Sequence, residues 1–355
     1  MAEARVARAR VALAAGALLV SLLAAEAGMR LLAPQWYDTD TLRRTAPELP
    51  LGRYRRVAAD PDLVYELEPG LDASFAGSRV LTDAQGVRQP EKPAERSPGA
   101  LELVVLGDST SFGWRVAYEQ SYPALLAVQL EAAWGRPVHL VNRSVPGFNS
   151  EQELAVLRRD VLPGRPALVL WHVDHNDANP ILEPHQPALL PPEAGDNALS
   201  SALLKACRRA WLRRELEQRL HETEPAERLG GYLVGGPLWE RHVAALELGV
   251  REAAAAAVPL ALVLFDCNVW VGDESREHLE RLHEPLTARL LPAGAVLIDL
   301  YPDLAAHAEA QGWTGLQSLW LAGDDPHPSQ AGHELVANLL ARALLQRWPA
   351  PPGTP

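Results

Sequence analysis

The stretch that decides the fold is Leu101–Ser111, which reads LELVVLGDSTS. Its first part, Leu101–Leu106, is a short and almost continuous run of Leu and Val, which is typical of a strand buried on both faces of a parallel sheet. Gly107 permits a tight turn, and a helix is expected to begin at the polar residues that follow. The stretch therefore predicts a strand, a turn and the start of a helix, with Ser109 in the turn.

Four further runs of the same kind lie downstream, and segments of helical character separate them. The runs are Val138–Asn142, Ala167–Val173, Leu260–Asp266 and Ala295–Leu300, and the helical segments are Gln120–Trp134, Ser150–Val161, Pro237–Ala257, Glu274–Leu291 and Gln330–Trp348. Strands that alternate with helices form right-handed βαβ units. We therefore predict an α/β domain over residues 101–350, a three-layer α/β/α sandwich around a central parallel five-stranded sheet.

Two segments do not fit this alternation. Residues 36–100 are irregular, with scattered Pro, Gly and Asp, and we expect a linker and a small β-rich leader region there. Residues 180–236 follow the third strand, are Pro-rich at first, and become charged and helical over 201–228. We expect this helical insertion to cover the active-site face or to pack beside it.

The amino terminus, residues 1–35, carries a targeting signal. Arg5, Arg8 and Arg10 precede the charge-free apolar run Val11–Ala25, a combination found in signal peptides and in membrane anchors. The run is shorter than the roughly 20 residues that cross a bilayer, but Leu31–Ala33 extends it if the intervening charged side chains reach the interface.

The arginines set the expected topology. Basic residues remain on the cytoplasmic side of a membrane, so the rest of the chain is expected outside. We predict a single-pass anchor in the inner membrane with the catalytic domain on the periplasmic side. Cleavage at Ala25-Glu26-Ala27, which would leave a secreted or periplasmic protein, is the alternative.

Composition excludes several classes of protein. The chain has 355 residues, 48% of them hydrophobic, and a formal net charge of −12, so it has no basic footprint for nucleic acid. Its two cysteines, Cys207 and Cys267, are too few for a disulfide framework or a four-thiolate metal site. A single bridge between them in an oxidising compartment stays open as an alternative.

Polar residues gather where the predicted strands end. Ser109 follows the first strand, Gly147 lies in the loop after the second, and Asn176 follows the third; Asp324 and His327 precede the last helix. Each alone is typical of a helix cap or a solvated loop. In open α/β sheets, however, ligands bind at the carboxyl ends of the strands, so these residues are expected to meet at one edge.

In this arrangement the chain resembles the SGNH hydrolases, also called GDSL esterases or lipases, over residues 101–348. The blocks that carry the resemblance are Val105–Gly113, the loop around Gly147, Asn176-Asp177 and Asp324–His327. The resemblance implies the flavodoxin-like fold of that family, and no cofactor.

The same resemblance implies a role for each site residue. Ser109 would be the nucleophile, His327 the general base and Asp324 the carboxylate that orients His327. The oxyanion hole would consist of the Ser109 amide, the Gly147 amide and the Asn176 side chain. A serine hydroxyl needs such a base, and the developing oxyanion needs such donors.

The third block departs from the family pattern, because Asp174 stands where the family has glycine. His172, Asp174 and His175 are all residue types that bind metals. Alternation along the strand, however, places His172 and Asp174 on one face and His175 on the other, and we therefore predict no metal. His333 in the last helix is expected to be partly buried rather than catalytic.

Trp114 and Trp171 fall near the predicted site. Stacking of their rings on a sugar is one interpretation, and filling of the hydrophobic core is the other.

Three functions remain open at this point. The leading one is an exported serine esterase that removes an acyl group, acetyl among the candidates, from an envelope glycan or a small ester. The second is an acyltransferase that uses the same triad on a polysaccharide, and the third is a non-catalytic envelope scaffold. The expected partners are the ester substrate and the membrane.

Overall fold

The computed structural model describes residues 2–32, 55–60, 62–75, 78–92, 96–178, 202, 234–265, 279–313, 319–321 and 325–352. The chain divides into two compact units. One comprises residues 1–57 and 184–222, and the other comprises residues 58–183 and 223–355. The predicted insertion at 180–236 lies outside the described residues except for Ala202 and 234–236, and so do Cys207 and Cys267.

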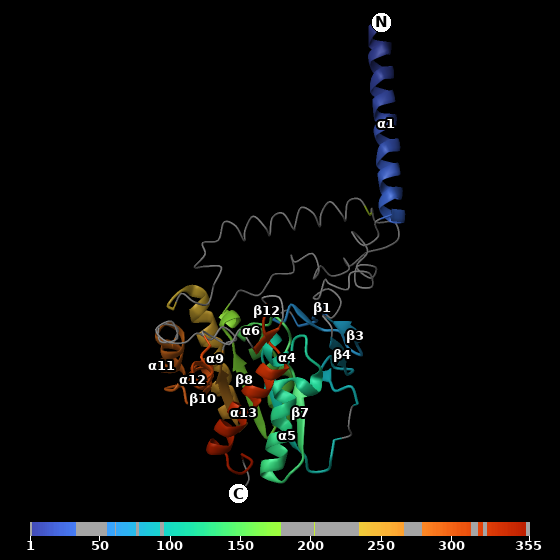
Figure 1. The fold of residues 1–355 in the computed structure, drawn as a ribbon. Helices are drawn as coiled ribbons and strands as arrows, with labels where there is room; N and C mark the ends of the chain where they lie inside the picture. The colour runs from blue at the N-terminus through green and yellow to red at the C-terminus, as the bar shows by residue number, and fades with distance from the viewer. Residues whose placement is uncertain are drawn as a thin grey trace. The chain divides into compact units, whose positions relative to one another are not determined.

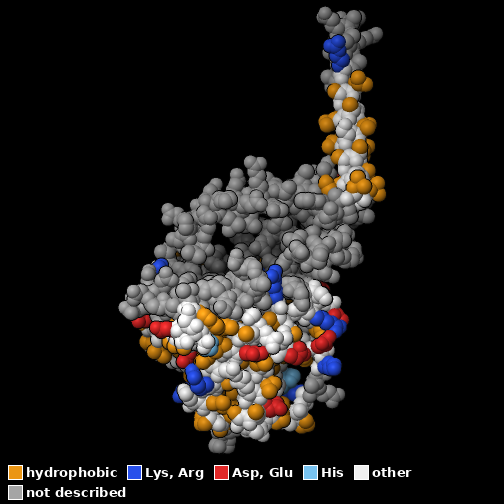
Figure 2. Space-filling model, viewed as in Figure 1, with side chains coloured by type: hydrophobic (Ala, Val, Ile, Leu, Met, Phe, Trp, Pro, Cys, Tyr) orange, Lys and Arg blue, Asp and Glu red, His pale blue; other side chains and the backbone are white. Residues whose placement is uncertain are grey.

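In its described residues the first unit contains the long helix α1 (Ala2–Leu32) and the short strand β1 (Arg55–Val57). Within α1, Leu13–Leu32 forms a stretch of 20 residues with mean hydropathy 1.6, none of it buried, which is long and apolar enough to cross a membrane. Figure 2 shows hydrophobic side chains along this helix. Arg30 and Glu26 form an ion pair of 2.7 Å one turn apart, so the helix continues past the charged residues that interrupt the apolar run.

The second unit is built on a sheet whose central part is parallel, as the sequence predicted. Five parallel strands lie in the order β10 (Val296–Asp299), β9 (Leu260–Leu264), β8 (Leu168–Val173), β6 (Leu101–Leu106) and β7 (Val138–Asn142). Every residue of β8 and of β9 is buried, as expected for strands covered on both faces.

The expected five strands are not the whole sheet, which has eight. Three strands of the leader region continue it antiparallel beyond β7: β5 (Arg88–Gln89), β4 (Ser78–Thr82) and β3 (Asp72–Phe75). A further leader strand, β2, spans Tyr65–Leu67. Strands β3, β4 and β5 of the leader region are therefore part of the same sheet as the predicted parallel strands, which their short lengths did not reveal in the sequence.

Helices cover the sheet on both faces and complete the three layers (Figure 1). On one face, α5 (Tyr122–Trp134), α12 (Tyr301–Ala310) and α13 (Gln330–Arg347) pack on a core that includes Leu103, Leu170 and Val263. On the other face lie α6 (Ser150–Val156) and α9 (Pro237–Ala255), where Gly249 packs closely against the ring of Trp171. The α/β/α sandwich is thus confirmed.

The remaining elements are short. They are α4 (Ser109–Phe112), α11 (Glu284–Leu290), the 3-10 turns Tyr118–Gln120, Leu162–Gly164 and His175–Ala178, the π-helical turns Leu157–Val161 and Leu279–His283, and the antiparallel pair β11 (Trp320–Leu321) and β12 (Asp325–Pro328). The helix predicted over Ser150–Val161 is α6 extended by a π-helical turn. The helix predicted over Glu274–Leu291 corresponds in its described part to a π-helical turn and α11.

Candidate active site

The turn after β6 presents Ser109 at the start of α4. Gly107 has φ 154°, and a Cβ there would lie 2.8 Å from Cβ of Ser111, so the turn requires glycine. Asp108 caps the helix, since its Oδ1 accepts a hydrogen bond of 2.9 Å from the Thr110 amide. The cap and the glycine together fix the direction in which Ser109 leaves the strand.

Ser109 meets His327, which lies 218 residues further along the chain, on β12. Nε2 of His327 is 2.8 Å from Oγ of Ser109, within hydrogen-bond distance. Oγ of Ser109 is also 3.0 Å from Oδ2 of Asp108, so the single hydroxyl proton has two acceptors. The structure thus brings together the two side chains that the sequence had placed at opposite ends of the domain.

The other residues of the expected site are only partly described. Asp324 lies outside the described residues. Asn176 lies in the 3-10 turn that follows β8, but its side chain is not among those described. Their roles remain predictions from the sequence.

Gly147 lies in a tight turn that the leader region supports. The Phe148 amide donates to the Val145 carbonyl at 3.0 Å, and Gly147 has φ 75°, which suits the third position of a type II turn. The hydroxyl of Tyr65, from β2, donates to the Gly147 carbonyl at 2.7 Å. A buried side chain of the leader region therefore holds the loop that carries Gly147.

A second leader residue, Arg88, holds the carboxyl end of α4. Its guanidinium donates to the carbonyls of Phe112, Gly113 and Val116, and the last two bonds measure 2.9 and 2.8 Å. Arg88 is 1% exposed, and burial lowers the pKa of its guanidinium to about 10. Arg88 was not predicted from the sequence, because an arginine in a two-residue strand gives no signal that it is buried.

Trp114 packs beside the imidazole of His327. The two rings are stacked, with centroids 5.4 Å apart and an interplanar angle of 25°. The Trp114 amide donates to the Ser109 carbonyl at 3.0 Å, so the same residue also contacts the backbone of the turn that carries Ser109. Trp171, by contrast, is fully buried and donates to Glu153 at 2.7 Å, so the core interpretation holds for this residue and the sugar interpretation is wrong.

Asp174, the departure from the family pattern, contacts the turn that carries Ser109. Its Oδ2 accepts a hydrogen bond of 3.2 Å from Oγ1 of Thr110. Asp108, His172 and Asp174 are buried and each offers one ligand atom, all within 4.8 Å of one another. The shared face of His172 and Asp174 agrees with their alternation along the strand, and Asp108 joins them in this group.

Two more carboxyl groups are buried near this cluster. Burial and then the charges of Asp108 and Asp174 raise the pKa of Glu153 well above its ordinary value, against the hydrogen bond from Trp171. Burial and then the charge of Glu153 likewise raise the pKa of Asp177. Both groups therefore favour the protonated form more than an exposed carboxyl does.

His333 lies in the core rather than in the site. It is fully buried on α13, and its Nδ1 accepts a hydrogen bond of 3.2 Å from the Tyr122 amide. Burial lowers the pKa of His333 to about 3. Its burial is more complete than the sequence analysis expected.

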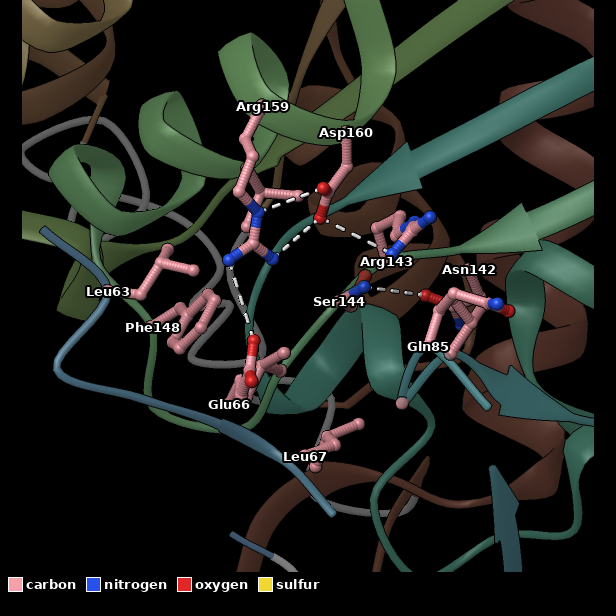
Figure 3. Close-up of a pocket in the computed structure, with 14 residues that line it drawn as sticks. Leu63, Glu66, Leu67, Gln85, Asn142, Arg143, Ser144, Phe148, Arg159 and Asp160 are labelled. Atoms are coloured by element: carbon pink, nitrogen blue, oxygen red, sulfur yellow. Dashed lines mark hydrogen bonds and ion pairs between the residues drawn. The ribbon is translucent and has the colours of Figure 1, made fainter. Parts of the chain in front are cut away.

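A separate pocket lies between the leader region and the segment that follows α6 (Figure 3). Its charged side chains pair with one another: Arg159 with Glu66 at 3.5 Å and with Asp160 at 2.8 Å, and Arg143 with Asp160 at 3.3 Å. Neither Ser109 nor His327 lines this pocket. The pair between Arg159 and Glu66 links the leader region to the sandwich.

Comparison with known proteins gives one family match. Residues 105–335 match the GDSL-like lipase/acylhydrolase family. This range includes all four sequence blocks.

A curated relative covers a smaller part of the chain. Thioesterase 1/protease 1/lysophospholipase L1 of Escherichia coli (strain K12) is 34% identical over 91 residues, which are 26% of this chain and 42% of the relative. The match therefore spans less than half the length of that enzyme.

Solved structures with similar folds include two further proteins. The crystal structure of TesA has 19% sequence identity and a TM-score of 0.42, over 68% of this chain and 97% of that one. A catalytic mutant of Axe2, an acetylxylan esterase from Geobacillus stearothermophilus, has 17% identity and a TM-score of 0.44, over 69% of this chain and 93% of that one.

Proposed function

Because this chain belongs to the GDSL-like lipase/acylhydrolase family, a family of ester-bond hydrolases, we propose that it is a serine esterase with Ser109 as nucleophile and His327 as general base. The observation that carries the proposal is the distance of 2.8 Å between Oγ of Ser109 and Nε2 of His327. An unactivated serine hydroxyl is a poor nucleophile, and an imidazole at this distance can accept its proton.

The reaction follows the usual course of acyl transfer to serine. Oγ of Ser109 attacks the ester carbonyl while Nε2 of His327 takes the hydroxyl proton, and the imidazolium then gives that proton to the departing alcohol. Water then attacks the acyl group on Ser109 while Nε2 of His327 takes a proton from it, the bond between Oγ and the acyl carbon breaks, and Oγ regains the proton as the acid leaves. When Nε2 accepts a proton, Nδ1 carries one, and in the proposal Asp324 accepts a hydrogen bond from it and so orients the ring.

The oxyanion that forms on the carbonyl needs donors in fixed positions. We assign these to the amides of Ser109 and Gly147 and to the side chain of Asn176. Asp108 caps the turn that carries the first amide by accepting from the Thr110 amide, and Tyr65 holds the turn that carries the second by donating to the Gly147 carbonyl. Loss of one such donor typically costs about 10²- to 10³-fold in rate.

The substrate in this proposal is an acyl ester, acetyl among the candidates, on an envelope glycan or a small molecule. The apolar helix α1 supports a location at the membrane, with the catalytic unit on the periplasmic side. The printed activities of the relatives, a thioesterase and lysophospholipase in one case and an acetylxylan esterase in the other, are both acyl hydrolyses. Acyl transfer to a sugar hydroxyl uses the same first half-reaction and differs only in the acceptor.

A fluorophosphonate probe tests the proposal directly. We expect it to label the wild type at Ser109 and to fail to label Ser109→Ala. The matched control is Ser111→Ala, the same change in the same turn, because Ser111 is buried and contacts the Tyr122 hydroxyl at 2.6 Å. Equal labelling of Ser109→Ala and the wild type would refute the assignment.

Product analysis distinguishes the two acceptors. With an acetyl ester and a sugar acceptor present together, the esterase is expected to release free acetate. Acetylated sugar as the main product would make the protein an acyltransferase, and no turnover at all would favour the scaffold.

A further inference from the structure

We propose that Trp114 is a positioning residue for His327, and that Arg88 of the leader region holds Trp114 in place. The inference rests on the proposed function, since it takes His327 as the base. It assigns a role in the reaction to two residues outside the proposed triad and oxyanion hole.

The first step is the closed set of contacts around the nucleophile. Ser109 bonds to His327 through its hydroxyl at 2.8 Å, and to Trp114 through its carbonyl at 3.0 Å. Trp114 in turn stacks on the imidazole of His327, with the ring centroids 5.4 Å apart. Three residues thus contact one another in a triangle, so the position of the indole limits the orientations open to the imidazole.

His327 lies on a short strand and depends on neighbouring side chains for its position. It lies on β12, a strand of four residues whose partner β11 has only two described residues, and β12 ends in proline. Proline has no amide to donate, so neither Pro326 nor Pro328 can give the strand a hydrogen bond from its backbone nitrogen. The position of the imidazole matters for the rate, because a displacement of about 1 Å in a catalytic group can lower the rate about 100-fold.

The third step is the support of Trp114 itself. Trp114 directly follows Gly113, where α4 ends, and the carbonyls on both sides of it have the same donor. Arg88 donates to Phe112 and Gly113 before it and to Val116 after it. The guanidinium carbon also lies 4.5 Å from the centre of the Phe112 ring. A planar group with several donors can hold three carbonyls at once, which a lysine ammonium cannot do with the same geometry.

The fourth step is the origin of Arg88. It belongs to β5, which pairs with β7 at Asn142, and Asn142 itself donates to the Ser111 carbonyl at 2.8 Å. Ser78 of β4 adds a hydrogen bond of 2.7 Å to the Val116 carbonyl. The antiparallel extension of the sheet therefore supplies the contacts that fix the loop after the nucleophile.

Two substitutions of Trp114 test the positioning role. We expect Trp114→Leu to lower kcat for a short ester, and the rate constant of fluorophosphonate labelling, about 10- to 100-fold, with KM changed less than 2-fold. Trp114→Phe retains a flat ring and is expected to keep at least a third of both rates. The matched control is Trp313→Leu, because Trp313 packs on another histidine, His307, with ring centroids 5.8 Å apart; there we expect unchanged rates.

Arg88→Lys tests the second half of the inference. We expect a loss in kcat similar to that of Trp114→Leu. The kcat of the double variant Arg88→Lys/Trp114→Leu is expected to lie within about 3-fold of the kcat of either single variant, since both changes disturb the same contact. Circular dichroism and the Tm show whether Arg88→Lys folds. If it does not, the Trp114 variants decide alone.

Two results would overturn the inference. If Trp114→Leu has a raised KM but unchanged kcat and an unchanged rate of labelling, the indole contacts the substrate and does not position His327. Labelling retained by Ser109→Ala would refute the proposed function and the inference with it, whereas labelling lost in Ser109→Ala but unchanged in Trp114→Leu would refute only the inference.

Discussion

At the scale of single residues, Gly113 shows how closely the site is packed. It has φ +82°, and a Cβ there would lie 2.6 Å from Nη1 of Arg88 and 2.7 Å from Cβ of Ser121. Both the backbone conformation and the space therefore exclude a side chain. The close approach of Arg88 to the end of α4 depends on this glycine.

Gly113→Ala is expected to lower the free energy of unfolding by about 2–4 kcal/mol and to reduce esterase activity in the folded fraction. The control is Gly135→Ala. Gly135 also has a positive φ, +62°, but nothing lies within 4 Å of its added Cβ, so only the backbone cost of about 1 kcal/mol applies. Chemical denaturation measures both, and equal losses would show that the contact with Arg88 adds nothing.

The proximity of Ser109 and His327 was easier to predict from the sequence than the residues that support them. Ser109 and His327 have recognisable chemistry at recognisable places, and the structure brings them together. Arg88 and Tyr65 act from the leader region through backbone carbonyls, and any residue can offer a carbonyl. No pattern in the sequence marks such a contact, because it depends on the pairing of β5 with β7.

At the scale of elements, two helices each bury a histidine against their neighbours. His242 of α9 contacts Oγ of Ser150 at 2.7 Å, and His333 of α13 accepts from the Tyr122 amide. Burial lowers the pKa of His242 to about 4 and that of His333 to about 3. Both side chains are therefore neutral in the folded protein over most of the pH range in which an unfolded histidine takes up a proton.

This burial makes stability depend on pH. An unfolded histidine titrates near pH 6.5, so the stabilisation is complete above that pH and is lost as the pH falls toward the folded values of about 4 and about 3. We expect each histidine to lower the free energy of unfolding by about 2 kcal/mol between pH 7 and pH 5.

The variant His242→Gln measures how much of this pH dependence comes from the histidine of α9. It is expected to remove about half of the histidine contribution, seen by chemical denaturation at the two pH values. Glu153 and Asp177 act in the opposite sense, because their raised pKa values favour the folded state at low pH. The difference between variant and wild type cancels that effect, and an unchanged pH dependence in His242→Gln would contradict the prediction.

The elements that the sequence predicted are those that carry their own signal. The five parallel strands are continuous apolar runs, and each begins and ends within two residues of its prediction over the described range. β5 has two residues and a buried charge, so only its partners make it a strand. The helix α12 was not predicted, although Pro302 in its first turn is a typical helix start.

At the scale of the whole molecule, the chain divides into two units near residue 57. The leader strands β3, β4 and β5 belong to the unit that contains Ser109 and His327, and β5 pairs with the edge of β7 that the parallel sheet would otherwise leave unpaired. An unpaired edge strand favours aggregation. The boundary of the catalytic unit therefore lies before the leader strands, rather than at the first parallel strand.

Two shortened chains test this boundary and the role of α1. We expect the chain of residues 58–355 to be found outside the membrane fraction and to keep fluorophosphonate labelling. The chain of residues 101–355 is expected to aggregate, because it lacks Tyr65, Ser78 and Arg88. The full chain is expected to resist carbonate extraction from membranes. If expression of the full chain instead gives a soluble product whose amino terminus lies near Ala25, the segment is a cleaved signal peptide.

The pairing of β5 with β7 also has a consequence for biosynthesis. Arg88 pairs with Asn142, so about 50 residues must follow β5 out of the ribosome before its partner exists. At about 5–20 residues per second, the leader strands wait on the order of several seconds in the nascent chain. The part of the catalytic unit that is made first thus has no partner strand during that interval, and its backbone is then open to chaperones and proteases.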